Sequence, residues 1–104
     1  MAVGDIEFQQ INNNVDHNGW LFTIKTSKQK TLLKYLNKNK VISRPFWMPM
    51  NQLPMYENCH YISKNDNCRN IHDYCMSIPC STSISDEDLE IVVLKIKNFF
   101  KSCI

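Results

Sequence analysis

The chain has 104 residues, which is enough for one small domain with a single modest core. Its hydrophobic fraction of 43% and charged fraction of 21% are typical of a soluble globular protein, and its net charge of +2 argues against nucleic acid or an anionic membrane as a partner. The apolar runs are too short to span a bilayer, and the N-terminus is too polar for a signal peptide. The odd number of cysteines, 5, therefore favours reduced thiols and a cytoplasmic location. With only Gly4 and Gly19, the chain has no glycine-rich phosphate loop and no complete nucleotide-binding fold.

The first part of the chain predicts two strands and a helix. Residues 6–9 alternate weakly between apolar and polar side chains, as an edge strand does, and residues 20–24 form an aromatic and β-branched run typical of a central strand. Thr26 with Gln29 three residues later is a capping-box pattern, which predicts that a helix opens there and ends over residues 37–40. One apolar stripe of this helix comprises Leu32, Leu33 and Leu36.

The middle of the chain predicts a strand that gives way to a long loop. Residues 41–47 begin as a strand, but three prolines from Pro45 to Pro54 cannot all lie in a central strand, because each lacks a hydrogen-bond donor. We therefore expect an ordered loop over residues 46–61, rich in aromatic residues and methionine. A short helix over residues 65–75 and an extended segment over 76–79 follow.

The last element is predicted most clearly. Ser85 and Asp88 form a capping box, and acidic residues lie at the positive end of the helix dipole. The apolar face of this helix comprises Leu89, Val92, Val93, Ile96, Phe99 and Phe100. The resulting order, β-β-α-β-α-α, predicts an α+β fold in which helices pack on a small antiparallel or mixed sheet.

Cysteine and histidine residues offer two kinds of candidate site. Cys68, His72 and Cys75 have spacings that place them on one helix face, with Cys59 and His60 upstream, but the paired C-x2-C knuckles of a structural zinc site are absent. The alternative is that Cys68, Ile71 and Cys75 are the buried stripe of a short helix, and we expect this and no metal. No local signature marks any cysteine as a catalytic nucleophile, so we assign no catalytic residue.

Two further residues are candidates for ligand contact. His17 stands at the mouth of the predicted central strand, where it is either a turn residue or a side chain facing a cleft. Arg44 lies in an otherwise apolar aromatic segment, which suits either recognition of a carboxylate or phosphate or a structural ion pair. The surrounding aromatic and methionine side chains, including Trp47, either line a cleft or cover the core.

The same segment resembles a known enzyme family. Residues 43–56 (SRPFWMPMNQLPMY) resemble the small-domain signature of the DegT/DnrJ/EryC1/StrS sugar aminotransferases. Residues 17–24 (HNGWLFTI), 75–81 (CMSIPCS) and 85–88 (SDED) resemble that family's landmarks and occur in the same order. The resemblance covers residues 16–101. This chain departs from the pattern at Asn51, where the family commonly has histidine, and at Cys75, where it usually has glycine.

This resemblance implies a function for the chain. Family members are pyridoxal-phosphate enzymes that aminate nucleotide-linked keto sugars for cell-surface polysaccharides or glycans, and the Arg44–Trp47 form looks closest to the enzymes of bacillosamine or legionaminic acid precursors. Residues 16–104 would be the C-terminal small domain of a type I-fold aminotransferase, with residues 1–15 as a leader or edge strand. The substrate contacts that the resemblance implies are His17, Arg44, Trp47 and Asn51.

The resemblance also implies what the chain does not supply. The family's catalytic lysine and cofactor contacts lie in a preceding large domain, and no lysine here has the context of a Schiff-base residue. We therefore expect no cofactor site in this chain, no activity from it alone, and partners in a large domain, a dimer mate and a nucleotide-sugar substrate. The alternative is a free-standing interaction module that uses the aromatic and methionine-rich loop of residues 44–61.

Overall fold

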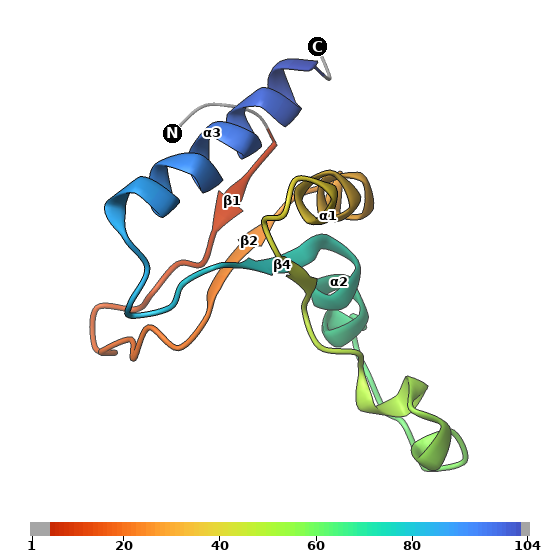
Figure 1. Cartoon of the computed structure of the whole chain (residues 1–104). Coiled ribbons are helices and arrows are strands. Elements are labelled where there is room, and N and C mark those ends of the chain that lie inside the picture. The colour runs from red at the N-terminus through yellow and green to blue at the C-terminus, as the bar shows by residue number, and fades with distance from the viewer. Residues whose placement is uncertain (1–4, 103–104) are drawn as a thin grey trace.

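Four short strands form one antiparallel sheet in the order β1-β2-β4-β3, and three α-helices accompany it (Figure 1). The structure is a computed structural model that describes residues 5–102. The strands are β1 (Glu7–Phe8), β2 (Phe22–Lys25), β3 (Arg44–Pro45) and β4 (Cys75–Ile78). The helices are α1 (Gln29–Lys38), α2 (Asn67–Tyr74) and α3 (Asp86–Ser102), with short 3-10 helices η1 (Met50–Gln52) and η2 (Pro54–Tyr56) between β3 and α2. The predicted α+β fold with a small antiparallel sheet is confirmed.

Strand β4 corrects the predicted order of elements. The sequence predicted only an extended segment over residues 76–79 and did not count it as a strand, yet β4 lies between β2 and β3 and pairs with both. The predicted strand over residues 41–47 is reduced to β3, which has only two residues and lies at an edge of the sheet. Proline is tolerated at an edge because its missing donor can face away from the neighbouring strand.

One face of the sheet forms the floor of the core. Ile24 of β2 and Met76 of β4 are directly paired, so their side chains project from the same face, and both are buried. In Figure 1, α1 and α3 lie above the strands, while α2 lies below β4. The helical side chains of this core are Leu32, Leu36, Val92, Ile96, Phe99 and Phe100.

The opposite face of the sheet is polar. Side chains alternate between faces along a strand and directly paired residues share a face, so the register assigns six residues to this face. We call it the polar face; its members are Glu7, Thr23, Lys25, Arg44, Cys75 and Ser77. Two contacts cross it: Lys25 forms an ion pair with Glu7 at 3.8 Å, and the hydroxyls of Thr23 and Ser77 are 3.4 Å apart.

The predicted capping box at the start of α1 is wrong. The helix begins at Gln29 with Lys28 as its N-cap residue, and no side chain caps it. The Gln29 side chain is buried and donates from Nε2 to two backbone carbonyls, those of His72 at 2.6 Å and Cys75 at 2.5 Å. Because this amide links α1 to the junction between α2 and β4, it is not available to cap its own helix. A backbone bond supports the same junction, since the Thr26 N–H donates to the Tyr74 carbonyl at 2.8 Å.

The expectations for α3 and α2 have different outcomes. At α3, Ser85 Oγ accepts a hydrogen bond from the Asp88 N–H at 3.1 Å, which confirms the predicted cap. At α2, the predicted buried stripe is wrong, because Cys68 and Ile71 are exposed and Cys75 belongs to β4. For the same reason Cys68, His72 and Cys75 do not share a helix face.

Two absences apply to the part of the chain that is described. Within residues 5–102, no three His, Cys, Asp or Glu side chains are grouped so that they could hold a metal ion. No helix among the same residues has the length and apolar character needed to cross a bilayer.

We predict that Gln29→Ala lowers the free energy of unfolding by about 1–3 kcal/mol, because the His72 and Cys75 carbonyls each lose a hydrogen bond from this buried side chain. This corresponds to a fall in Tm of about 4–8 °C for each kcal/mol. Urea unfolding of both proteins measures the change, and the matched control is Gln52→Ala, at an exposed glutamine of η1. Equal stability losses in the two variants would contradict the role assigned to Gln29.

A second prediction concerns Asp5, whose carboxylate accepts hydrogen bonds from Ser27 Oγ and from the Ser27 N–H, the latter at 2.8 Å. These bonds, the hydroxyl's first, hold the pKa of Asp5 below its ordinary value. A carboxyl group with a lowered pKa in the folded state stabilises the fold at neutral pH, and this stabilisation disappears as pH falls through the lowered pKa.

The wild-type chain should therefore be slightly more stable than Asp5→Asn at pH 7, and the difference should vanish in acid. The effect is small because Asp5 is exposed. Urea unfolding over a pH series measures it, with Asp16→Asn as the matched exposed control. A stability difference that grows as pH falls has the wrong sign for this interaction.

Candidate functional site

Arg44 lies at one end of a row of polar side chains that crosses three strands. Arg44 of β3 is paired with Ser77 of β4, and Ser77 is paired with Thr23 of β2, so all three lie on the polar face. Arg44 is exposed, and no carboxylate of residues 5–102 lies within ion-pair distance of it. The structural ion pair that the sequence left open for Arg44 is therefore absent from this part of the chain. The row presents one guanidinium and two hydroxyls to solvent-accessible space.

Three aromatic residues flank the strands that carry this row: Trp20 precedes β2, and Phe46 and Trp47 follow β3. Phe46 lies two residues after Arg44, and its side chain helps to line a hollow of about 320 Å³ on the polar face together with Thr23 and Lys25. Trp47 stacks on Phe46 with ring centroids 5.8 Å apart, and it meets Trp20 edge to face at 5.6 Å. We call Trp20, Phe46 and Trp47 the aromatic cluster. It joins the segment before β2 to the segment after β3, and Trp47 remains 62% exposed, so its ring is available to a ligand.

His17 takes part in the turn that leads to this cluster. His17 Nδ1 accepts a hydrogen bond from the Gly19 N–H at 2.9 Å, and Asn18 Oδ1 accepts one from the Trp20 N–H at 3.0 Å. Gly19 has φ of +68°, a conformation that side chains other than glycine rarely adopt. His17 therefore helps to fix the backbone before Trp20, as expected of a turn residue, and its Nε2 makes no hydrogen bond to residues 5–102.

Asn51 lies in a different place, on η1. Its Oδ1 atom is buried and accepts no hydrogen bond from residues 5–102, although the residue as a whole is only half-buried. The residue lines a hollow of about 330 Å³, which we call the Asn51 hollow. The other residues lining it are Pro49, Met50, Tyr56, Cys59, His60, Tyr61 and Cys68. Arg44 and Trp47 thus lie three residues apart at the end of β3, whereas Asn51 lines a separate hollow.

Cys75, at the position where the resemblance leads one to expect glycine, adopts an ordinary extended conformation. Its φ of −105° and ψ of 147° are accessible to any residue, so the departure from glycine introduces no backbone strain. The side chain lines the hollow on the polar face, and burial raises the pKa of the thiol above its ordinary value. The thiol is therefore poorly suited to act as a nucleophile at neutral pH.

Sequence reasoning missed four residues of this site: Thr23, Ser77, Trp20 and Phe46. The signal for Ser77 was its alternation with Met76 and Ile78, which is meaningful only once β4 is recognised as a strand. The contact between Trp20 and Trp47 joins residues 27 positions apart in the sequence, and no local pattern indicates it.

The family assignment follows from comparison with known proteins. Residues 2–97 match the model of the DegT/DnrJ/EryC1/StrS aminotransferase family. The chain therefore belongs to this family, as the resemblance of its sequence implied. No individual curated protein matches the sequence significantly.

Several solved structures share the fold at low sequence identity. DesV of S. venezuelae, solved in complex with a ketimine intermediate, superposes with a TM-score of 0.85 at 14% identity, over 95% of this chain and 27% of DesV. The aminotransferase TlmJ from Streptoalloteichus hindustanus gives 0.85 at 11% identity, over 99% and 28% of the two chains. Helicobacter pylori PseC, an aminotransferase involved in the biosynthesis of pseudoaminic acid, gives 0.69 at 17% identity, over 79% and 24%. The chain thus spans about a quarter of the length of these enzymes.

The residues of this chain do not fit the family's cofactor, pyridoxal phosphate. A Schiff-base lysine needs a desolvated site, whereas none of the lysines, all of which lie within residues 5–102, is buried. Lys95 and Lys97 are half-buried on α3 and the others are exposed. No step of cofactor chemistry can therefore be assigned to these residues.

We predict that this chain alone forms no Schiff base with pyridoxal phosphate, because no lysine lies in a desolvated pocket. Titration of the cofactor should give no stoichiometric imine absorption band at about 400 nm. Mass spectrometry after borohydride reduction should find no single predominant phosphopyridoxyl-lysine. One stoichiometric adduct at one lysine would overturn the prediction, whereas slow labelling spread over the exposed lysines would not.

Proposed function

We propose that this chain is the small domain of a pyridoxal-phosphate-dependent aminotransferase that aminates a nucleotide-linked keto sugar. In this proposal residues 16–104 close the substrate cleft, and a large cofactor-binding domain and a dimer mate supply the rest of the site. The amino sugar would serve cell-surface polysaccharide or glycan biosynthesis. Membership of the aminotransferase family supports this interpretation over a free-standing interaction module built on residues 44–61.

The observation that carries the proposal is the environment of Arg44. An exposed guanidinium with no acidic partner in residues 5–102 keeps its five donors available, and its planar fork matches the oxygens of a phosphate. A nucleotide-linked sugar carries such phosphates. The hydroxyls of Ser77 and Thr23, next along the same row, can donate to or accept from sugar hydroxyls.

The aromatic cluster supplies the second kind of contact that such a substrate needs. Nucleotide bases and sugar rings present flat or apolar faces that pack on aromatic side chains, and Trp47 is exposed and follows Arg44 by three residues. In the proposal Trp47 packs on the substrate, while His17 orders the turn before Trp20 and offers Nε2 as a further polar contact.

Asn51 is proposed as the remaining substrate contact. Its Oδ1 lacks a donor in residues 5–102, and the residue lines the Asn51 hollow. In the proposal the amide turns toward the hollow, where a ligand hydroxyl or N–H group donates to Oδ1. The Arg44–Trp47 segment further supports a sugar of the kind that leads to bacillosamine or legionaminic acid, since the segment looks most like the enzymes of that subgroup.

We predict that Arg44→Ala, in the complete aminotransferase, weakens transition-state binding by about 1.5–3 kcal/mol, the range of a charge-assisted hydrogen bond. The measured loss in kcat/KM should be about 10- to 100-fold, and Arg44→Lys should restore only part of it. Tm should stay within a few degrees of wild type, because no ion pair within the described residues is lost. Steady-state kinetics and thermal melting of the same preparations measure both effects.

The matched control is Arg69→Ala, at the chain's other arginine, which lies on α2 and forms an exposed ion pair with Asp73 at 3.8 Å. This variant should retain kcat/KM. An Arg44→Ala enzyme that is folded and as active as wild type would remove Arg44 from the substrate site.

A further inference from the structure

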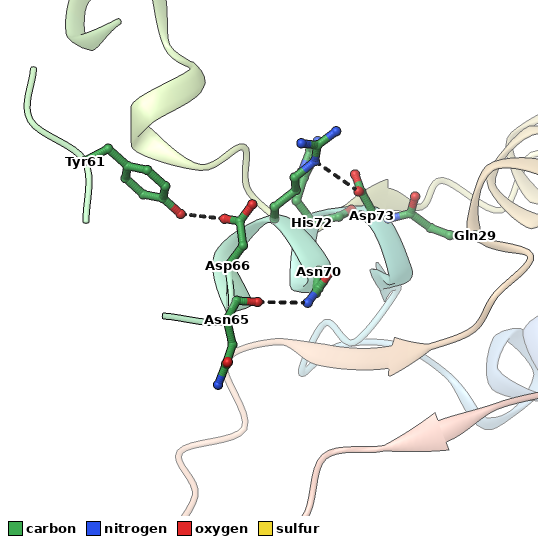
Figure 2. A network of polar contacts seen from close by, with 8 residues as sticks. Gln29, Tyr61, Asn65, Asp66, Asn70, His72 and Asp73 are labelled. Atoms are coloured by element: carbon green, nitrogen blue, oxygen red, sulfur yellow. Dashed lines mark hydrogen bonds and ion pairs between the residues drawn. The ribbon is translucent and has the colours of Figure 1, made fainter. Parts of the chain in front are cut away.

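Cys59 and Cys68 lie on either side of a reversal of the chain. Tyr61 donates from its hydroxyl to Asp66 Oδ1 at 2.5 Å, and the Asp66 N–H donates to Ser63 Oγ at 2.7 Å. Figure 2 shows the Tyr61 ring directed at the Asp66 carboxylate, at the point where the chain enters α2. Asp66 has φ of +51°, so the backbone itself turns there. Each cysteine is thus two residues outside the pair that bridges the turn.

Both cysteines face the same space. They are exposed free thiols, and both line the Asn51 hollow of about 330 Å³. The two other described cysteines lie elsewhere: Cys75 lines the hollow on the polar face, and the Cys80 thiol donates to the Trp20 carbonyl at 3.5 Å. Among residues 5–102, therefore, Cys59 and Cys68 are the two thiols that line one hollow together.

We propose that Cys59 and Cys68 are a modification site that a small-molecule disulfide, such as glutathione disulfide, converts to an intramolecular disulfide. The thiolate of one cysteine attacks the glutathione disulfide and releases one glutathione thiolate, which leaves a mixed disulfide on the protein. The thiolate of the second cysteine then attacks the protein sulfur and releases the second glutathione. Two protein thiols are oxidised and one glutathione disulfide is reduced to two glutathione molecules, so atoms and electrons balance.

The segment between the cysteines can make the movement that bond formation requires. A disulfide needs Cα atoms about 4.4–6.8 Å apart, and residues 57–65 are all exposed, so no core packing opposes a shift of this segment. Reversible disulfides of this kind in reducing compartments are typically redox-sensing. The new bond would join two residues that line the Asn51 hollow. If Asn51 contacts the substrate, the bond would also alter substrate binding, and this consequence alone rests on the proposed function.

The test uses the chain as it is, treated with glutathione disulfide, then alkylated and analysed by peptide mass spectrometry. The expected main product is a peptide pair linked through Cys59 and Cys68, which dithiothreitol reverses. Cys59→Ser should leave a stable glutathione adduct on Cys68, and Cys68→Ser should leave one on Cys59, because the second step is then impossible. The matched control, Cys80→Ser, should form the Cys59–Cys68 link as wild type does.

A further variant, Tyr61→Phe, tests the geometry itself. It removes the hydroxyl that bridges to Asp66, so the link should form several-fold more slowly while the first glutathione adduct forms at an unchanged rate. The proposal is overturned if wild type accumulates separate glutathione adducts on the two cysteines, if neither reacts, or if either pairs as readily with another cysteine. None of these outcomes depends on the substrate, so failure here is distinguishable from failure of the proposed aminotransferase role.

Discussion

The two hydrogen bonds donated by the Gln29 side chain are the constraint on which the arrangement of this chain depends. They hold the carbonyl of His72, in the last turn of α2, and that of Cys75, the first residue of β4. Fixing that corner fixes where β4 starts against β2 and β3. A slip of one residue would send Ser77 to the apolar face and Met76 to the polar one. The row that runs from Thr23 to Arg44 therefore depends on the buried amide of Gln29 together with the backbone bond from Thr26 to Tyr74.

This dependence explains which parts of the fold could be predicted from sequence. Helix α3 was predicted well because its signals are local: the Ser85 cap, the acidic first turn and an apolar face that packs on the core. Helix α1 showed an equally good local pattern at Thr26 and Gln29, but the glutamine bonds to carbonyls 43 and 46 residues away. Strand β4 was missed as a strand for a related reason, since its four residues become a central strand only through partners distant in sequence.

The residues of the candidate site likewise fall into those that the sequence indicated and those that only the strand pairing reveals. Arg44 and Trp47 stood out in the sequence because an arginine among aromatic residues is chemically conspicuous. In the structure Arg44 pairs with Ser77 in the sheet, and Trp47, three residues later, contacts Trp20. Ser77 and Thr23 could not be predicted as site residues from the sequence, because nothing in the local pattern marks these two hydroxyl residues. Only the strand register places Ser77 opposite Arg44 and Thr23 opposite Ser77. The expected buried stripe of α2 failed because Cys75 leaves the helix for β4, which separates it from Cys68.

Pro45 determines at which edge the sheet can pair with a further strand. The Phe46 N–H donates to the Cys75 carbonyl at 3.1 Å, so the backbone nitrogen of the preceding residue points away from β4. That nitrogen belongs to Pro45 and carries no hydrogen, so the outer edge of β3 cannot offer a full ladder to another strand. At the opposite edge, β1 ends the sheet, and no strand of residues 5–102 lies beyond it. A neighbouring chain that extends this sheet must therefore add beside β1. The proline ring of Pro45, which leaves its nitrogen without a hydrogen, blocks aggregation through β3.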